Sequence, residues 1–386
     1  MSGGIVQLVA TGAQDAWLTG KPEVSFFRSS YKRYTHYANS VERQLIQGNP
    51  SAGNISTIRL EKKGDLVNSI YMVAKDSTGA VIPGINWTNV IDKIELLVGG
   101  QVVDTQDITW MTSIEPITGA QNFSQRFLNH NTGPTNITAG FLPLKFFFCK
   151  DWNVSMPMVA LQYHDVEIRI TWSTTLGTSL TSYAGLNGLA SGTAAYSSFQ
   201  YEAWTNFVYL DQAEREYFAS TPMDLLITQV NRIPIATTNM QELALAHPTK
   251  FLTFQSNNYT QAYQLAATAG IPAINYQFKT QINGVDIGDT RSMLQWIDVP
   301  QYYFTPYGYN ANQATANVAL ISYCLDTSKL QPTGTLNFSR IDTYRIVAPA
   351  GVSLSTLAGG AGRYFYAMNY NVLRIKDGMG GLLYSN

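Results

Sequence analysis

The sequence predicts an all-β protein made of two tandem sandwich domains joined by a short helix. Stretches rich in branched and aromatic residues recur along the 386-residue chain, and glycine, proline and asparagine separate them. One charged helical segment lies past the midpoint, between two strand-rich parts that each suit an eight-stranded sandwich. The chain also exceeds the roughly 250–300 residues at which a single hydrophobic core stops growing.

The clearest predicted strand runs from 165 to 172, where Val166, Ile168, Ile170 and Trp172 alternate with polar residues. Alternation with a period of two buries one face of a strand and leaves the other face in water. Similar stretches predict strands at 69–74, 90–98, 204–210, 224–233, 251–255, 274–282, 318–324, 336–346 and 363–375.

The helix between the two domains is predicted at 211–220. Asp211 can cap its amino end, Glu214 stands at the capping-box position, and Pro222 ends the helix. The expected parts are therefore an N-terminal arm at 1–24, a first sandwich at 25–210, a helical linker at 211–222 and a second sandwich at 223–386.

The two halves also resemble each other faintly, which suggests a tandem duplication. Residues 91–111 and 276–296 share a strand, a glycine turn, a second strand and trailing apolar residues. Long surface loops are expected at 119–140, 172–200 and 305–317.

Composition narrows the function. The chain has 25 basic and 26 acidic side chains and a net charge of −1, so a general nucleic-acid binder is excluded. Charged residues make up 13% and aromatic residues 12% of the chain, which suits broad protein contacts better than solvation. No apolar run approaches the roughly 18 residues of a membrane span. The two cysteines form neither a disulfide framework nor a thiolate cluster.

Signatures of catalysis are missing or weak. The four histidines have no second ligand at metal spacing, so neither a metal nor a cofactor is expected. His164 and Asp165 could form a general base with its orienting carboxylate, but neighbours in a strand point to opposite faces. The pairs Asp165 with Glu167 and Asp286 with Asp289 could serve glycoside hydrolysis, although a solvated, charge-balanced face explains the first pair more simply.

An amino-terminal stretch at 21–43 interleaves basic and aromatic side chains. Such a mixture could grip single-stranded nucleic acid. Its small excess of positive charge favours an arm that docks on protein or lies near a membrane.

Asn-x-Ser/Thr sequons are a further candidate feature, and their number is only a small excess over chance. The possible glycosylation sites are Asn54, Asn86, Asn122, Asn136, Asn153, Asn258 and Asn337.

Four segments resemble the double jelly-roll major capsid proteins of the nucleo-cytoplasmic large DNA viruses. They are GAQDAWLTGKPEVSFFRSSYKRYTHYA at 12–38, PLKFFFCKDWNVSMPMVALQYHDVEIRI at 143–170, LNFSRIDTYRI at 336–346 and YAMNYNVLRIKDGMGGLLYSN at 366–386. These segments span the chain from end to end in the family's order. This chain is shorter than many members, which puts a large outer insertion in doubt.

The resemblance implies that each half is an eight-stranded jelly roll and that the chain is a structural protein, not an enzyme. Three chains would form a pseudo-hexagonal capsomer, and capsomers would tile an icosahedral virion shell over an internal membrane. It further implies contacts with neighbouring capsomers and with minor capsid and penton proteins, no direct contact with nucleic acid, and assembly in the host cytoplasm. The three long loops would form the outward crown.

Within this reading, the N-terminal arm is the candidate inner-shell contact. The alternative is a first strand packed into the core of its own domain. Tyr370, Asn371 and Leu373 are expected in a core strand. The residues expected to make this contact lie just beyond position 24, in the basic and aromatic stretch 21–43 that continues the arm, and are called the arm residues below: Phe26, Phe27, Arg28, Tyr31, Lys32, Arg33 and Tyr34.

Two rival functions remain at this point. A carbohydrate-binding or receptor-binding jelly roll would need a concave aromatic cleft. A glycosidase would need two facing acids in a pocket. Neither rival explains the four matching segments.

Overall fold

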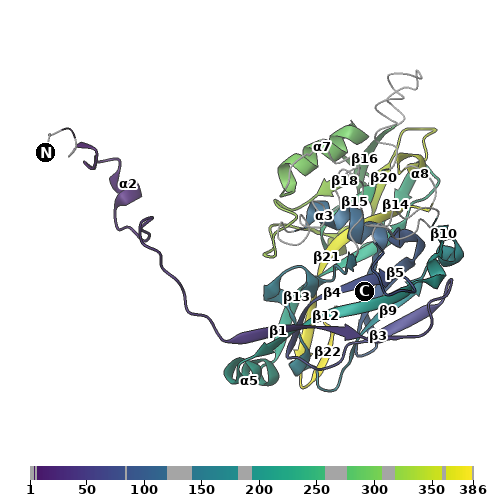
Figure 1. Ribbon diagram of the computed structural model, residues 1–386. Coiled ribbons are helices and arrows are strands. Elements are labelled where there is room, and N and C mark those ends of the chain that lie inside the picture. The colour runs from purple at the N-terminus through teal and green to yellow at the C-terminus, as the bar shows by residue number, and fades with distance from the viewer. Residues whose placement is uncertain are drawn as a thin grey trace. The chain divides into compact units, whose positions relative to one another are not determined.

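The structure is a computed structural model that describes residues 4, 7–82, 85–119, 141–180, 194–256, 276–306, 318–358 and 362–384. It divides into two units, Met1–His36 and Tyr37–Asn386. The first unit contains one short helix, α2 (Ala16–Thr19), and no strand among its described residues. The second unit contains two sandwiches of antiparallel sheets, and Figure 1 labels many of their strands.

The first sandwich pairs two five-stranded sheets. One sheet has the order β1 (Tyr37–Gln44), β12 (Gln200–Leu210), β4 (Leu66–Lys75) and β7 (Phe141–Pro143), with β8 (Met156–Pro157) beside β4. The other has the order β2 (Ile46–Gln47), β3 (Ile55–Arg59), β9 (Val166–Trp172), β5 (Ile91–Val98) and β6 (Gln101–Asp107). A small ribbon joins β10 (Ser179–Leu180) to β11 (Ala194–Ala195).

The second sandwich has sheets of six and four strands. The larger has the order β13 (Met223–Pro234), β21 (Tyr364–Lys376), β15 (Pro248–Gln255) and β18 (Val318–Ser322), with β19 (Leu336–Asn337) beside β15 and β22 (Met379–Leu382) beside β21. The smaller has the order β14 (Met240–Glu242), β20 (Tyr344–Val347), β16 (Gln277–Ile282) and β17 (Val285–Ser292).

The two sandwiches share one strand order. In each, the first long strand of the half borders the last long strand, as β1 borders β12 and β13 borders β21. In each sandwich, a hairpin lies at one edge of a sheet and leads into a helical segment. In the first sandwich β5 and β6 form this hairpin, before a helical segment that begins at Trp110. In the second, β16 and β17 form it, before α7 (Met293–Phe304). This correspondence matches the faint internal resemblance at 91–111 and 276–296.

Helices connect or cover the sandwiches. α5 (Gln212–Ser220) joins the two halves. α7 (Met293–Phe304) begins with a capping box, because the Ser292 hydroxyl accepts from the Gln295 amide and the Gln295 side chain accepts from the Ser292 amide. α3 (Glu115–Thr118) and α8 (Leu354–Leu357) are single turns. Among the described residues, no helix is long and apolar enough to cross a membrane.

Two apolar clusters form the cores. The larger cluster fills the first sandwich. It also includes residues of β13, β15, β18 and β21, so it covers one face of the six-stranded sheet of the second sandwich. The smaller lies within the second sandwich, where Phe278 stacks on Trp296 of α7 at a centroid separation of 4.8 Å. The larger sheet of the second sandwich is therefore buried on both faces, and its polar side chains need partners.

Most predicted strands are present, and their alternation is as expected. Val166, Ile168, Ile170 and Trp172 are buried while the residues between them are partly exposed. β21 contains Tyr370, Asn371 and Leu373 in buried positions, which confirms their prediction as core residues.

Three details of the predictions were wrong. The stretch 336–346 is not one strand, because a 3-10 helix at Phe338–Arg340 separates β19 from β20. Asp211 precedes α5 but makes no side-chain capping bond, so the capping box with Glu214 does not form. His164 and Asp165 lie just before β9, and strand alternation does not decide their orientation.

Candidate assembly surfaces and the junction between the sandwiches

The junction between the sandwiches is built on the packing of β6 against β13. The backbone amide of Val230 in β13 donates to Oδ1 of Asp104 in β6 at 2.8 Å. The Gln106 side chain donates to the other oxygen of Asp104 at 2.7 Å. Burial raises the pKa of Asp104 to about 6, because both hydrogen bonds compensate only part of the lost hydration.

Amide side chains on β13 and β21 form further hydrogen bonds at this junction. Gln229 donates to the carbonyl oxygen of Val103 in β6 and accepts from Asn369 at 3.2 Å and from Asn371 at 3.0 Å. All three amide side chains are buried. Each amide therefore has a partner in a region where an unpaired polar group would be costly.

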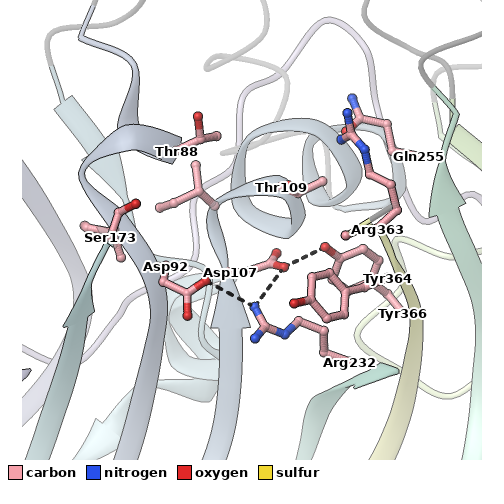
Figure 2. A pocket seen from close by; sticks show the side chains of 13 residues that line it. Thr88, Asp92, Asp107, Thr109, Ser173, Arg232, Gln255, Arg363, Tyr364 and Tyr366 are labelled. Atoms are coloured by element: carbon pink, nitrogen blue, oxygen red, sulfur yellow. Dashed lines mark hydrogen bonds and ion pairs between the residues drawn. The ribbon is translucent and has the colours of Figure 1, made fainter. Parts of the chain in front are cut away.

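A second carboxylate, Asp107 at the end of β6, fastens the same junction (Figure 2). Its Oδ2 accepts from the Tyr366 hydroxyl at 2.6 Å and from Arg232 at 3.5 Å, and its Oδ1 accepts from the Trp110 amide at 2.8 Å. Arg232 also lies 3.9 Å from Asp92. Burial raises the pKa of Asp107, and the Tyr366 hydrogen bond opposes that shift.

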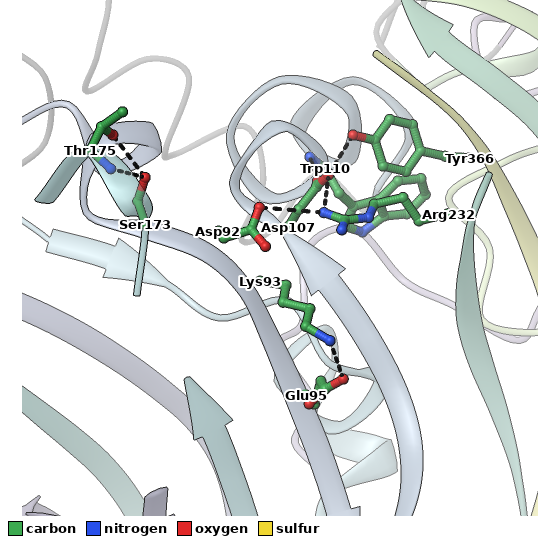
Figure 3. Close-up of polar contacts among 9 residues, drawn as sticks. All are labelled: Asp92, Lys93, Glu95, Asp107, Trp110, Ser173, Thr175, Arg232 and Tyr366. Atoms are coloured by element: carbon green, nitrogen blue, oxygen red, sulfur yellow. Dashed lines mark hydrogen bonds and ion pairs between the residues drawn. The ribbon is translucent and has the colours of Figure 1, made fainter. Parts of the chain in front are cut away.

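Aromatic packing surrounds this carboxylate (Figure 3). The Trp110 ring stacks on Phe251 at 6.2 Å and lies 5.8 Å from Tyr366, while the Arg232 guanidinium lies 4.2 Å above the Tyr364 ring. Arg232, Tyr364 and Tyr366 line one side of a cleft of about 330 Å³ between the sandwiches. Asp92 and Asp107 share Arg232 across this cleft, so the pair forms part of a structural joint and does not present two facing acids to a sugar.

The carboxyl-terminal hairpin of β21 and β22 clasps the first sandwich. Nδ1 of His164 lies 2.8 Å from the Gly380 carbonyl oxygen and 3.1 Å from its amide nitrogen, and the Tyr163 amide donates to the Gly378 carbonyl at 2.9 Å. The Leu382 amide donates to Gln101 at 3.1 Å. The segments 143–170 and 366–386, which carry much of the family resemblance, therefore contact each other.

Asp165 and Asp286, two of the other acids singled out in the sequence, are paired with cations. Asp165 contacts Arg59 and lies 3.4 Å from Lys62, and Asp286 lies 2.6 Å from Lys279. Nδ1 of His164 is within hydrogen-bond distance of the Gly380 backbone, where it either donates to the carbonyl oxygen or accepts from the amide, so this histidine helps to hold the carboxyl-terminal hairpin. The described part of the chain contains no group of three His, Cys, Asp or Glu side chains placed to hold a metal.

The arm residues belong to the first unit. The exposed fractions of Phe26 and Phe27 are 94% and 101%, and those of Tyr31 and Tyr34 are 89% and 82%. Arg28, Lys32 and Arg33 are exposed as well. Residues 26–34 contain no strand, and β1 begins only at Tyr37. The arm thus presents a row of aromatic and basic side chains.

Four of the seven sequons fall on described residues, and Asn54, Asn86, Asn153 and Asn337 are exposed. At Asn86 and Asn337 the side-chain oxygen accepts from the amide and hydroxyl of the residue two positions on, Thr88 and Ser339. Here the Asn-x-Ser/Thr pattern caps a 3-10 helix, which gives it a structural role. Asn122, Asn136 and Asn258 lie outside the described residues, as do most of the three expected crown loops.

Sequence reasoning did not find the junction residues Asp104, Asp107, Arg232 and Tyr366. The polar sequence of β6, QVVDTQD, was one weak signal of the junction, because the structure buries several of these polar side chains. A polar strand at the edge of a buried sheet indicates a partner, although it does not identify the partner.

Comparisons with known proteins agree with this geometry. A model described as the major capsid protein N-terminus matches residues 25–211, and one described as the large eukaryotic DNA virus major capsid protein matches residues 214–381. The major capsid protein of Paramecium bursaria Chlorella virus 1 is 30% identical over 452 aligned residues, which cover 100% of both chains. That of Pyramimonas orientalis virus is 28% identical over 429 residues, again with 100% of both chains covered.

Solved structures give the same picture. A chain of the PBCV-1 virus capsid has a TM-score of 0.69 and 27% identity, with 94% of this chain and 100% of that chain covered. The Faustovirus major capsid protein has a TM-score of 0.57 and 10% identity, with 95% of both chains covered, and supports the fold alone.

Proposed function

The chain belongs to the family of major capsid proteins of large eukaryotic DNA viruses, and we propose that three copies of it form one capsomer of the shell. It has the double jelly-roll fold of this family and is a structural, non-enzymatic component of the virion capsid. The open question is which of its surfaces meet in the assembly.

One observation carries the trimer proposal. β6 and β17 are equivalent edge strands of the two jelly rolls. Among the described residues, β6 packs against β13 of the other jelly roll, while no strand of the first jelly roll packs in the same way against β17. Every residue of β17 before Ser292 is exposed, including Val285 at 69% and Ile287 at 44%. An exposed edge strand with apolar side chains is a ready site for another chain.

The equivalent of β13 in the first jelly roll is β1, which is the edge strand of its own sheet and mostly exposed. In an ungapped alignment of 91–111 with 276–296, Asp289 of β17 takes the place of Asp104 of β6. We infer that β17 of one copy packs against β1 of the next and that Asp289 accepts a backbone amide there, as Asp104 accepts from Val230 within the chain.

This contact is heterologous, because it joins two different surfaces, and it closes into a ring when the rotation is threefold. Three chains then give six jelly rolls around one axis, with alternating contacts of the same kind inside and between chains. That arrangement has a pseudo-hexagonal outline, which lets capsomers tile an icosahedral shell.

The finer expectations remain proposals that rest on the family resemblance. Neighbouring capsomers, minor capsid proteins, penton proteins and an internal membrane are the proposed partners, and the host cytoplasm is the proposed site of assembly. The exposed aromatic and basic arm supports an inner-shell contact. The strand order supports a division into jelly rolls on either side of α5.

Light scattering on the full-length chain tests the trimer. We expect a particle of about 128 kDa, three times the 42.7 kDa chain. Ile287→Lys should shift the particle toward the monomer, because it buries a charge in the proposed contact. Val81→Lys is the control, since Val81 is 45% exposed but lies outside β1 and β17. A stable wild-type monomer, or equal trimer fractions in both variants, contradicts the proposal.

A further inference from the structure

A small cavity between the two jelly rolls is lined by apolar side chains together with lysines, hydroxyl groups and two acids. Its volume is about 60 Å³. Lys150 reaches it from the first jelly roll, and Thr228, Lys250, Thr327 and Tyr370 reach it from the second. The cavity lies apart from the cleft around Asp107, whose lining shares none of these residues.

The two lysines bring positive charge to this buried place. Nζ of Lys150 donates to the Thr228 hydroxyl at 3.3 Å. Nζ of Lys250 donates to the carbonyl oxygens of Thr327 at 2.7 Å and Lys329 at 3.1 Å. Burial lowers the pKa of both lysines, that of Lys250 to about 8, and the charge of Lys150 contributes to the shift at Lys250. The hydrogen-bond partners of both ammonium groups are neutral, and the charges of Glu115 and Asp104 only partly oppose the fall in the pKa of Lys150.

Two hydroxyl groups on the same wall are unsatisfied. The Tyr370 hydroxyl and the Thr327 hydroxyl have no hydrogen-bond partner among the described residues. Tyr370 is 7% exposed and Thr327 is 4% exposed, so bulk water does not reach them freely. Buried hydroxyls without partners are uncommon, and each such group calls for an explanation.

The two acids of the lining, Glu115 and Asp151, also have partners of their own. Glu115 lies 3.2 Å from Lys145, and both side chains are almost fully buried. Asp151 accepts from the amide of Asn153 at 3.0 Å, where it caps a 3-10 helix. The lining therefore carries an excess of hydrogen-bond donors and of positive charge.

We propose that this cavity binds a small inorganic anion, of the size of chloride or phosphate, between the two jelly rolls. The anion accepts from the Tyr370 and Thr327 hydroxyls and offsets the charges of Lys150 and Lys250. A cavity needs roughly 10–15 Å³ by this measure to hold one water, so this cavity has room for an ion of this size. The competing occupant is water alone. The proposal concerns the single chain and does not rest on the trimer contact.

Thermal unfolding of the full-length protein tests the site. The unfolding temperature is measured during titration with chloride or phosphate, with gluconate keeping the ionic strength constant. A saturable rise is expected with at least one of the two small anions, because a ligand that binds only the folded state stabilises it. Tyr370→Phe should weaken the apparent affinity about tenfold or more, since it removes one hydrogen bond to a charged group. Lys150→Met should weaken it further.

Tyr201→Phe is the matched control. Its hydroxyl donates to the Tyr196 carbonyl at 2.7 Å, away from the cavity, so the variant should lose stability and keep the wild-type anion dependence. A bromide soak of crystals adds a direct readout, with an anomalous peak expected between Lys150 and Lys250.

Three results would overturn the proposal. One is equal unfolding temperatures in chloride, phosphate and gluconate, which leaves only water in the cavity. Another is wild-type anion dependence in Tyr370→Phe, which puts the anion elsewhere. The third is bromide density confined to other places. Thr327→Val repeats the affinity test if Lys150→Met does not fold.

Discussion

Removal of the Tyr366 hydroxyl is the sharpest test of how the two jelly rolls are joined. Tyr366 lies in β21 of the second jelly roll and donates to Asp107 of the first at 2.6 Å. The ring itself packs 5.8 Å from Trp110 and should stay in place when the hydroxyl is lost. Tyr366→Phe therefore deletes one charged hydrogen bond across the junction and little else.

The expected cost follows from the surroundings of Asp107. The carboxylate is almost fully buried, and after the change it retains the Trp110 amide at 2.8 Å and the more distant Arg232 at 3.5 Å. A hydrogen bond to a charged group contributes about 1.5–3 kcal/mol. Its loss also leaves a buried carboxylate oxygen with one donor fewer. We expect the free energy of unfolding to fall by about 2 kcal/mol.

Urea unfolding of the full-length protein measures this change. Tyr364→Phe is the matched control, because Tyr364 lies two residues away in the same strand and its ring, not its hydroxyl, meets Arg232. The control should cost less than about 0.5 kcal/mol, as surface changes usually do.

A double-mutant cycle with Asp107→Asn separates the pair from its surroundings. A coupling energy of about 1.5 kcal/mol or more is expected between Tyr366 and Asp107, since the two groups are in direct contact. Equal losses in Tyr366→Phe and Tyr364→Phe, or a coupling energy near zero, would refute the view that this hydrogen bond fastens the junction.

Three further predictions concern the turn at Gly99, the buried Asp104 and the arm. Gly99→Ala should destabilise the fold by about 2 kcal/mol or more, because Gly99 has a φ of +57° and an added Cβ would run into His164. Gly100→Ala, with a φ of +82° and open space, should cost only about 1 kcal/mol in urea unfolding. For Asp104, the folded-state pKa of about 6 exceeds the ordinary 3.8, so the folded protein takes up the proton first as the pH falls. The wild type should therefore gain stability relative to Asp104→Asn as the pH falls. The difference between their free energies of unfolding should rise by up to about 3 kcal/mol from pH 7 to pH 4. A decrease of this difference would contradict a buried, desolvated carboxylate. Deletion of residues 1–36 should leave the unfolding temperature of the rest unchanged while reducing particle assembly, because none of the described arm side chains is buried. A large loss of stability would place the arm in the core.

The fold was largely predictable because its signals are local. Alternation in 166–172 and the branched and aromatic stretches of β5, β12, β13 and β21 follow from one-sided or full burial of strands. Less local features were missed. α7 was not predicted, although Ser292 and Gln295 form its capping box, because Pro300 interrupts its helical pattern. The break at Phe338–Arg340 depends on an Asn337 side-chain cap, which the strand-like sequence conceals.

The junction was not predictable from the same signals. Asp104 and Asp107 stand in β6 among polar residues, a pattern typical of a strand that faces water. Their burial depends on β13 and β21, more than 100 residues away, which supply the Val230 amide and the Tyr366 hydroxyl. A periodicity reports the environment of one strand and contains no information about which distant strand covers it.

A polar junction suits the proposed trimer, in which the internal contact is repeated between copies. An apolar edge on both β6 and β17 would bind any similar strand, whereas a carboxylate that needs one backbone amide at a defined register rejects misaligned partners. Within the chain, Asp104 meets this requirement permanently, at the cost of a raised pKa. On β17 the corresponding Asp289 is exposed, and in the proposed trimer it accepts its amide only when another copy binds. The same pairing would then be permanent inside the chain and concentration-dependent between chains, so folding of the double jelly roll is expected to precede trimer formation.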